Sequence, residues 1–160
     1  MDFVHDQLTD NRAFRVLTVV DQWSRSSPIL RCGLSLRGSD VAEALDRAIG
    51  HGTPPRSITV DHGTEFMSRA LEEWAWRRGV QLDFTRPGKP TDNGYIASFN
   101  GKLRDECLNL NQFVSLADAP QQIDAWREEY NTIRPHSALG HLTPSEYQDI
   151  CQGNAIAEAA

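Results

Sequence analysis

Residues 57–84 read SITVDHGTEFMSRALEEWAWRRGVQLDF, and their pattern sets the fold class. Residues 57–61 are apolar and rich in β-branched side chains, which favour a strand. Residues 68–78 have the composition of a helix that ends at Gly79, and residues 80–84 predict a second short strand. Because a helix connects the two strands directly, they should pair in parallel.

Earlier in the chain, the sequence predicts three strands and a helix. The strands are short apolar runs with polar connections of a few residues between them, which suit antiparallel hairpins. They cover residues 2–5, 14–21 and 29–34. The helix should begin after Ser39 and end at Gly50 or Gly52.

Helices dominate the remainder. One is expected from about Asn93 to residue 108, and two more have capping-box signatures, Ser115 with Asp118 and Thr143 with Glu146. The sequence therefore predicts an α/β fold with a mixed five-stranded sheet, three antiparallel strands followed by parallel strands, flanked by helices. One domain should cover residues 1–150, and residues 151–160 should form a frayed tail.

The composition is that of an ordinary globular protein, with 39% hydrophobic and 24% charged residues. No apolar run approaches the roughly 20 residues that span a bilayer, so no membrane partner is expected. Three widely spaced cysteines without a metal-ligand pattern fit unpaired thiols in a reducing cytoplasm. The net charge of −6 argues against a nucleic-acid binder, but residues 69–104 carry a local charge of +3 that can contact a phosphate backbone.

Two aspartates stand at the ends of strand-like runs, Asp2 in MDFV and Asp61 after SITV. Ligand sites in α/β sheets favour the carboxyl ends of strands, where Asp61 should lie. Asp2 lies at the start of its strand, so the two can meet only if the first strand is central and the fourth runs beside it. Such carboxylates suit hard divalent cations, and a paired-metal phosphoryl-transfer centre would normally add a third acidic ligand.

Six segments of the chain form a specific set. They are MDFV, VLTVVDQWSR, ITVDHGTEFMSRAL, PGKPTDNGYIASFNGKLRDECLN, WREEYNTIRPHSALG and LTPSEY. Together, and in this order, they resemble the catalytic core of insertion-sequence transposases, an integrase core domain of the retroviral-integrase superfamily. The resemblance covers about residues 1–148. It implies a ribonuclease-H-like fold and a DDE-type transposase, which cleaves and joins DNA strands by phosphoryl transfer.

The resemblance also implies an active site of two aspartates and one glutamate that bind two divalent ions, Mg²⁺ or Mn²⁺. Asp2 and Asp61 take the two aspartate positions, both as catalytic residues and as metal ligands. In the family, the glutamate stands in a YIESFNG-like helix at a fixed interval after the second aspartate. Here the interval of 35 residues, 62–96, is kept, and Ala97 in YIASFNG holds the glutamate position.

Ala97 predicts a loss of activity, because alanine offers no ligand atom. We expect the chain to bind at most one metal ion, weakly, and not to cut or join DNA. Asp92 lies five residues earlier, and Asp105 and Glu106 lie eight and nine residues later, so none shares a helix turn with Ala97. Glu65 belongs to a turn that the family shares.

DNA contacts are expected on the helix face that carries Ala97 and on nearby basic side chains. The expected DNA-binding residues are Arg86, Lys89, Asn93, Lys102 and Arg104. The resemblance implies element ends and target DNA as partners, and a working assembly of more than one subunit. It also implies a bacterial cytoplasmic protein that is nucleoid-associated when bound to DNA. Such transposases usually carry helix-turn-helix segments upstream, and we expect that part to be missing before Met1.

Two other functions stay open. A metal-dependent nuclease of the same fold would hydrolyse DNA without joining strands, and a degenerate core would act as an inactive DNA-binding or self-association module. The DNA products of the Ala97→Glu variant distinguish the two enzymes, because a transposase would join strands whereas a nuclease would only cut them. Tight binding of two metal ions by the unaltered chain would contradict the inactive module.

Overall fold

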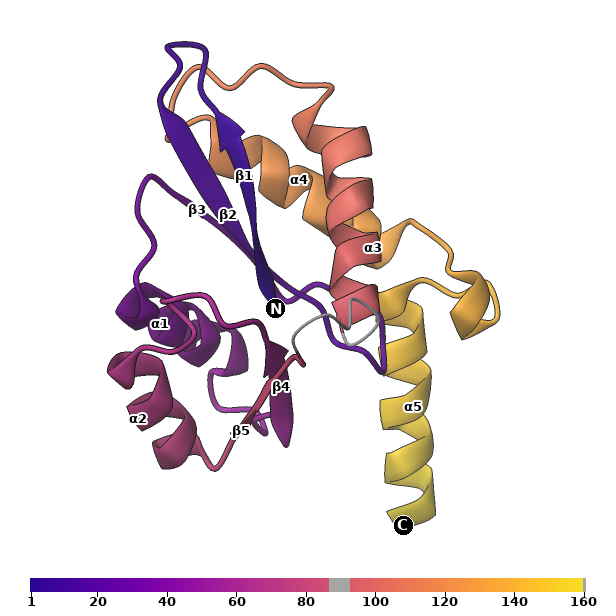
Figure 1. Cartoon of the computed structure of the whole chain (residues 1–160). Coiled ribbons are helices and arrows are strands. Elements are labelled where there is room, and N and C mark those ends of the chain that lie inside the picture. The colour runs from indigo at the N-terminus through magenta and orange to yellow at the C-terminus, as the bar shows by residue number, and fades with distance from the viewer. Residues whose placement is uncertain (87–92, 160) are drawn as a thin grey trace.

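The computed structural model describes residues 1–86 and 93–159, with side chains described as far as residue 152. Its strands are β1 (Asp2–Gln7), β2 (Ala13–Val19), β3 (Ile29–Gly33), β4 (Ser57–Val60) and β5 (Gln81–Phe84). Its helices are α1 (Gly38–Ile49), α2 (Arg69–Arg78), α3 (Gly94–Leu103), the π-helix η2 (Arg104–Leu108), α4 (Ala119–Thr132), the 3-10 helix η3 (Ser137–Leu139) and α5 (Pro144–Ala159). This is the mixed α/β architecture that the sequence predicts (Figure 1).

The first three strands form an antiparallel sheet in the order β1-β2-β3. Asp2 pairs with Thr18 in the register between β1 and β2. The buried Thr18 hydroxyl donates a hydrogen bond of 3.2 Å to the Asp2 carbonyl oxygen. The backbone of Asp2 is therefore held at the start of β1 by the central strand of the sheet.

The other two strands, β4 and β5, pair in parallel, and α2 connects them as predicted. Ser68 caps α2 by accepting a hydrogen bond of 3.3 Å from the Leu71 N–H, and Gly79 ends it with a φ of 66°. The strands follow the predicted order and directions, but their ladders form two sheets rather than one. A hydrogen bond of 2.8 Å from the Met1 ammonium to the Thr59 carbonyl oxygen joins the start of β1 to β4.

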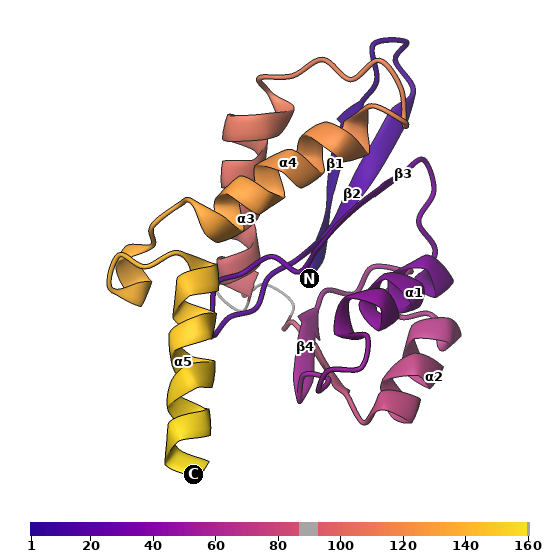
Figure 2. The ribbon, with the colours of Figure 1, turned by 180° about the vertical axis from the view of Figure 1, so that it is seen from behind.

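The three-stranded sheet lies between two hydrophobic cores. One face packs on α1, α2 and β4 through side chains that include Leu17. The opposite face packs on α3, η2 and α4 through side chains that include the neighbouring Val16, because successive side chains of a strand point to opposite faces. Figures 1 and 2 show α1 and α2 together at one end of the molecule, away from α3 and α4.

The later helices match their sequence signatures, with two differences. Thr143 and Glu146 form the expected capping box at the start of α5, with hydrogen bonds of 2.8 and 3.2 Å to each other's backbone N–H groups. However, α5 extends to Ala159, farther than its signature indicates, and the fraying of residues 151–160 stays a prediction. The helix expected from residue 93 to 108 consists of α3 followed by η2, so its last part has the wider π-helical winding.

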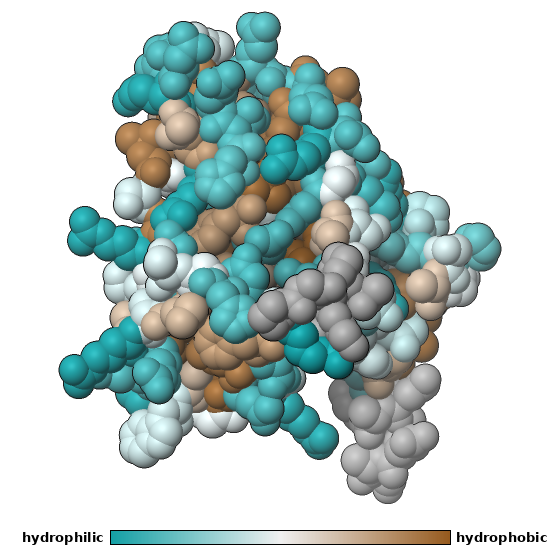
Figure 3. All heavy atoms as spheres, in the orientation of Figure 1, coloured by the Kyte–Doolittle hydropathy of each residue, from teal (hydrophilic) through white to brown (hydrophobic). Residues whose placement is uncertain are grey.

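On the face of the molecule that Figure 3 shows, hydrophilic side chains surround patches of hydrophobic ones. The most exposed of the large hydrophobic side chains is that of Trp76 on α2, at 84% among the described residues. None of the helices in the described part of the chain is long and apolar enough to cross a membrane.

Candidate functional site

Asp2 is half-buried, and both of its carboxylate oxygens accept hydrogen bonds. The Phe3 backbone N–H donates to Oδ1 at 2.7 Å, and Asn100 donates from Nδ2 to Oδ2 at 2.9 Å. Burial raises the pKa of Asp2 and the Asp61 charge adds to the rise, whereas the two hydrogen bonds oppose it. A cation bound at this carboxylate would favour its charged form.

Asp61 directly follows β4, at the carboxyl end of the strand, as the sequence predicts. The Gly63 backbone N–H donates to Asp61 Oδ1 at 2.8 Å, and a Cβ added at Gly63 would lie 2.9 Å from that oxygen. A side chain at Gly63 would therefore displace the carboxylate. Burial lowers the pKa of the Met1 ammonium to about 6, and the charges of Asp2 and Asp61 both oppose this shift. The two aspartates thus converge beside Met1.

Helix α3 reaches this pair through Asn100, which is 8% exposed. Its hydrogen bond to Asp2 holds α3 against the start of β1. Ala97 lies one turn earlier on the same side of α3 and is exposed, so it stands on the side of the helix that contacts Asp2. The sequence indicates that Asn100 shares this face, but its contact with Asp2 was not predicted; the spacing of three residues from Ala97 was the available signal.

Glu65 and Glu106 could in principle replace the missing glutamate, but both carboxylates are engaged with other side chains. Glu65 forms an ion pair of 2.6 Å with Arg15; burial alone would raise the pKa of Glu65, but its hydrogen bonds and the Arg15 charge hold it below its ordinary value. Glu106 accepts hydrogen bonds from Arg134 and Trp126. Within the described part of the chain, no group of three or more His, Cys, Asp or Glu side chains is arranged to hold a metal ion.

The donor set that remains fits one divalent cation. Asp2 and Asp61 supply carboxylate oxygens, and Mg²⁺ commonly uses only one or two protein carboxylates. Asn100 Oδ1 is buried and has no hydrogen-bond partner among the described residues, so a bound cation or its water would satisfy it. The second ion of a paired centre would lack a ligand at Ala97.

The expected DNA-binding residues on α3 lie on two different sides of the helix. Arg104 is exposed and lies on the side of Ala97, and Asn93 precedes the helix on that side. Lys102 lies about 140° around the helix axis from Ala97. It lines a cavity on the other side of α3.

The remaining expected contacts come from the chain between β5 and α3. Arg86 is exposed at the beginning of this connection. Lys89, together with Asp92, lies outside the described residues. The DNA-binding role of all five residues stays a prediction.

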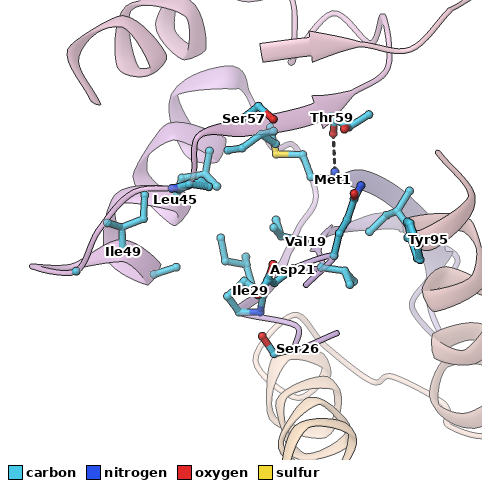
Figure 4. A pocket seen from close by; sticks show the side chains of 18 of the residues that line it. Met1, Val19, Asp21, Ser26, Ile29, Leu45, Ile49, Ser57, Thr59 and Tyr95 are labelled. Atoms are coloured by element: carbon cyan, nitrogen blue, oxygen red, sulfur yellow. Dashed lines mark hydrogen bonds between the residues drawn. The ribbon is translucent and has the colours of Figure 1, made fainter. Parts of the chain in front are cut away.

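A cavity of about 680 Å³ lies beside Met1, between the two sheets and α1 (Figure 4). Met1 and Thr59 form one of its walls, and Leu45 of α1 and Ile29 of β3 contribute apolar surface. Asp21 also lines it, but its carboxylate accepts a hydrogen bond of 2.6 Å from a neighbouring serine hydroxyl and orders the turn before β3. The metal-site aspartates are not among the described lining residues.

Models of the integrase core domain match the chain in two overlapping parts, residues 1–90 and residues 78–144. The first match includes Asp2 and Asp61, and the second includes Ala97. The chain therefore belongs to the integrase core domain family.

Relatives of the chain come from bacterial insertion elements. It is 47% identical over 160 residues to the insertion element IS407 uncharacterized 31.7 kDa protein of Burkholderia multivorans, covering 100% of this chain and 58% of that protein. It is 31% identical over 134 residues to the transposase for insertion sequence element IS904 of Lactococcus lactis, covering 81% of this chain and 52% of the relative. The resemblance to insertion-sequence transposases is thereby confirmed, and the chain spans about half the length of these curated relatives.

Solved structures with the same fold are retroviral integrases. The HTLV-2 integrase catalytic core domain in complex with magnesium matches with a TM-score of 0.71 at 16% identity, over 91% of each chain. An integrase chain of the simian T-cell lymphotropic virus intasome, in complex with PP2A regulatory subunit B56 gamma, gives 0.76 at 19% identity over 91% of this chain and 51% of its own. These matches confirm the ribonuclease-H-like fold.

Proposed function

We propose that this chain is the catalytic core of a bacterial insertion-sequence transposase whose strand cleavage and strand transfer are lost through Ala97. The observation that carries the proposal is the hydrogen bond of 2.9 Å from Asn100 to Asp2, because it joins Asp2 to the side of α3 on which Ala97 lies. A glutamate at that position would be the third carboxylate. Membership of the integrase core domain family and the relatives from insertion elements support transposition as the process.

In this proposal, Asp2 and Asp61 hold one divalent cation, Mg²⁺ or Mn²⁺, and Asn100 and the Gly63 N–H orient their carboxylates. The cation would neutralise charge on the phosphate that reacts. Ala97 adds no oxygen ligand, so the attacking and leaving oxygens cannot both be activated. The magnesium complex of a retroviral integrase core supports the choice of metal class.

DNA would lie along the side of α3 that carries Ala97, near Asn93 and Arg104, with Arg86 and Lys89 contributing from the preceding connection. Element ends and target DNA would be the partners, and holding two DNA ends together would require more than one copy of the chain. We place this assembly in the bacterial cytoplasm, on the nucleoid, with residues 1–150 as its core domain.

Ala97→Glu tests the proposal, because it adds the missing carboxylate at a surface position. We expect Mn²⁺ binding to change from at most one weak site to two sites, measured by isothermal titration calorimetry. Cleavage and joining of labelled DNA should appear with Mg²⁺ or Mn²⁺. Gln121→Glu is the matched control, since it adds the same charge at an exposed position on another helix, α4. Two tight metal sites or strand transfer in the unaltered chain would refute the loss of activity.

An inactive DNA-binding or self-association module is the second candidate, and Ala97 itself favours it. Under this alternative, Ala97→Glu would gain a metal site but no cleavage, while the unaltered chain would still bind DNA or itself. Cut but unjoined products from Ala97→Glu would instead indicate a nuclease of the same fold.

A further inference from the structure

A second cavity, of about 350 Å³, lies on the side of α3 that faces away from Ala97. One wall is α3 itself, through Tyr95, Ser98 and Lys102, which recur at three- and four-residue spacing. The end of α4 and the loop that follows it form another wall, and Arg25 comes from the turn between β2 and β3. Figures 1 and 2 both show this loop beside the first turns of α3.

The described lining of this cavity is basic. It includes Arg25, Lys102, Arg134 and His136 but no described acidic side chain. Arg134 is neutralised by Glu106, with Nη1 and Oε2 2.6 Å apart and a second bond from Nη2 to Oε1. Arg25 and Lys102 form no ion pair with a described residue, although the Glu106 charge also acts on Lys102 without direct contact.

Two of these side chains also have a buried polar atom without a partner. Arg25 Nη1 and His136 Nε2 are shielded from solvent and make no hydrogen bond to any described residue. Buried polar groups are nearly always hydrogen-bonded, so two such atoms on the lining of one cavity require an explanation. A ligand with several oxygen atoms would accept a hydrogen bond from Arg25 Nη1, and from His136 Nε2 when the imidazole is protonated.

The basic groups are positioned by the protein itself. Arg25 has a φ of 62°, in the left-handed region that residues with side chains rarely adopt. Its guanidinium lies over the Tyr95 ring, 4.1 Å from the centroid, and His136 packs edge-on against Tyr130 at 5.0 Å. Strained backbone of this kind is concentrated at ligand sites, where the surrounding contacts hold it in place.

We propose that this cavity binds a phosphate group of a DNA strand through Arg25, Lys102 and His136, at a place separate from the metal site. Phosphate oxygens accept several charge-assisted hydrogen bonds at once, which matches the basic lining and the two buried atoms that have no described partner. The choice of DNA as the source of the phosphate rests on the proposed function. Tyr95, which is 53% exposed, adds an aromatic ring at the same cavity on which a base can stack.

His136 reports on occupancy of the cavity. Burial lowers the pKa of His136, and the charges of Lys102, Arg134 and Arg25 lower it further. The other titratable groups nearby are Tyr130, which contacts its ring, and Glu106, which pairs with Arg134. A bound phosphate would offset the positive charges and should raise the pKa of His136.

NMR of the imidazole groups, with inorganic phosphate titrated into the intact chain, tests the cavity directly. We expect the His136 signals to shift and its pKa to rise. Lys102→Ala should weaken phosphate binding about tenfold or more, and Lys102→Arg should retain it. Lys102 is chosen because Arg25 packs on Tyr95 and its removal would also disturb the fold. Arg77→Ala, at an exposed position on α2, is the matched control. An unresponsive His136 overturns the anion site.

Fluorescence anisotropy with labelled single- and double-stranded oligonucleotides tests the source of the phosphate. Lys102→Ala should lower the slope of log affinity against log salt by about one, and Arg77→Ala should leave it unchanged. If phosphate shifts His136 but Lys102→Ala leaves DNA affinity and slope unchanged, DNA is not the ligand. If the chain binds no DNA at all while phosphate still shifts His136, the proposed function fails and the DNA assignment with it, whereas the anion site stands.

Discussion

The side-chain amide of Asn100 links α3 to the start of β1 through the Asp2 carboxylate. Burial makes this carboxylate harder to ionise, so its raised pKa lowers the stability of the fold as pH rises above the ordinary range of an aspartate. Packing alone therefore does not account for a carboxylate at this position. The divalent cation proposed above would account for it, because it would favour the charged form and interact with the Asp61 charge as well.

Glu106 contributes stability that depends on pH. Arg134 donates two hydrogen bonds to it and holds the pKa of Glu106 below its ordinary value of 4.5. The stabilisation is therefore present above about pH 4.5 and is lost as pH falls through the lowered pKa of the folded state. Glu106→Gln should cost about 1 kcal/mol at pH 7, since the pair is partly exposed to solvent, and much less at pH 3.

Urea unfolding of both proteins across this pH range measures the effect. Glu72→Gln, on the exposed side of α2, serves as the control and should change stability by less than about 0.5 kcal/mol. An equal loss for Glu106→Gln at both pH values would show that the carboxylate charge is not involved.

Among the elements, the start of α1 lies close to the start of α2 at Gly38. A Cβ there would lie 1.7 Å from the Ser68 hydroxyl oxygen and 2.8 Å from the Glu65 carbonyl oxygen. Ser68 is also the residue that caps α2. The contact between the two helices thus depends on the absence of a side chain at the first residue of α1.

Gly38→Ala should destabilise the protein by about 1–3 kcal/mol, because the added methyl group displaces the Ser68 cap and forces the helices apart. Gly101→Ala is the control, and its expected effect on the stability of the protein has the opposite sign. Nothing lies within 4 Å of a Cβ at Gly101 in α3, so alanine should stabilise that helix by about 0.5–1 kcal/mol. Thermal and urea unfolding measure both values, and equal effects of the two substitutions would contradict the close approach at Gly38.

The molecule as a whole is organised around the three-stranded sheet, which supplies side chains to both hydrophobic cores. Leu17 of β2 belongs to the core under α1 and α2, and Val16 belongs to the core under α3 and α4. Both cores include the central strand, so loss of either should unfold the other. We therefore expect one cooperative unfolding transition.

Leu17→Ala tests this coupling. Leu17 is fully buried, so the substitution should cost about 2–5 kcal/mol through lost burial and the remaining cavity. Circular dichroism and the NMR signal of the indole N–H of Trp126, which packs on the opposite core, should show the same lowered midpoint. Leu110→Ala, at a position 73% exposed, should change stability by less than about 0.5 kcal/mol. Two separate transitions would show that the cores unfold independently.

Much of this arrangement follows from local sequence patterns. The helix between β4 and β5 implies their parallel pairing, and the Thr143–Glu146 capping box marks the start of α5. The convergence of Asp2 and Asp61 depends on which strands are neighbours. The family resemblance implied that the two aspartates share one site. The strand patterns alone could state only that they meet if the first and fourth strands lie side by side.

Contacts between distant parts of the chain could not be predicted in this way. The ion pair between Arg15 and Glu65 joins residues on separate elements, and nothing in either local pattern indicates the partner. The left-handed φ of Arg25 has no glycine or asparagine to signal it. The position of Lys102 away from Ala97 could have been worked out from helix geometry, but its charge alone grouped it with the residues of the opposite face.

The two sides of α3 limit how nucleic acid can be arranged on this protein. A helix with its side chains is about 10–12 Å thick, so groups held on its opposite sides are separated by roughly that distance. Phosphates of one duplex strand advance about 3.4 Å along the axis per nucleotide. A phosphate next to Ala97 and another in the cavity beside Lys102 would therefore not be neighbours on one duplex strand; they would come from positions farther apart on that strand, or from two different strands. The thickness of α3 therefore sets the shortest length of DNA that can contact both of its sides.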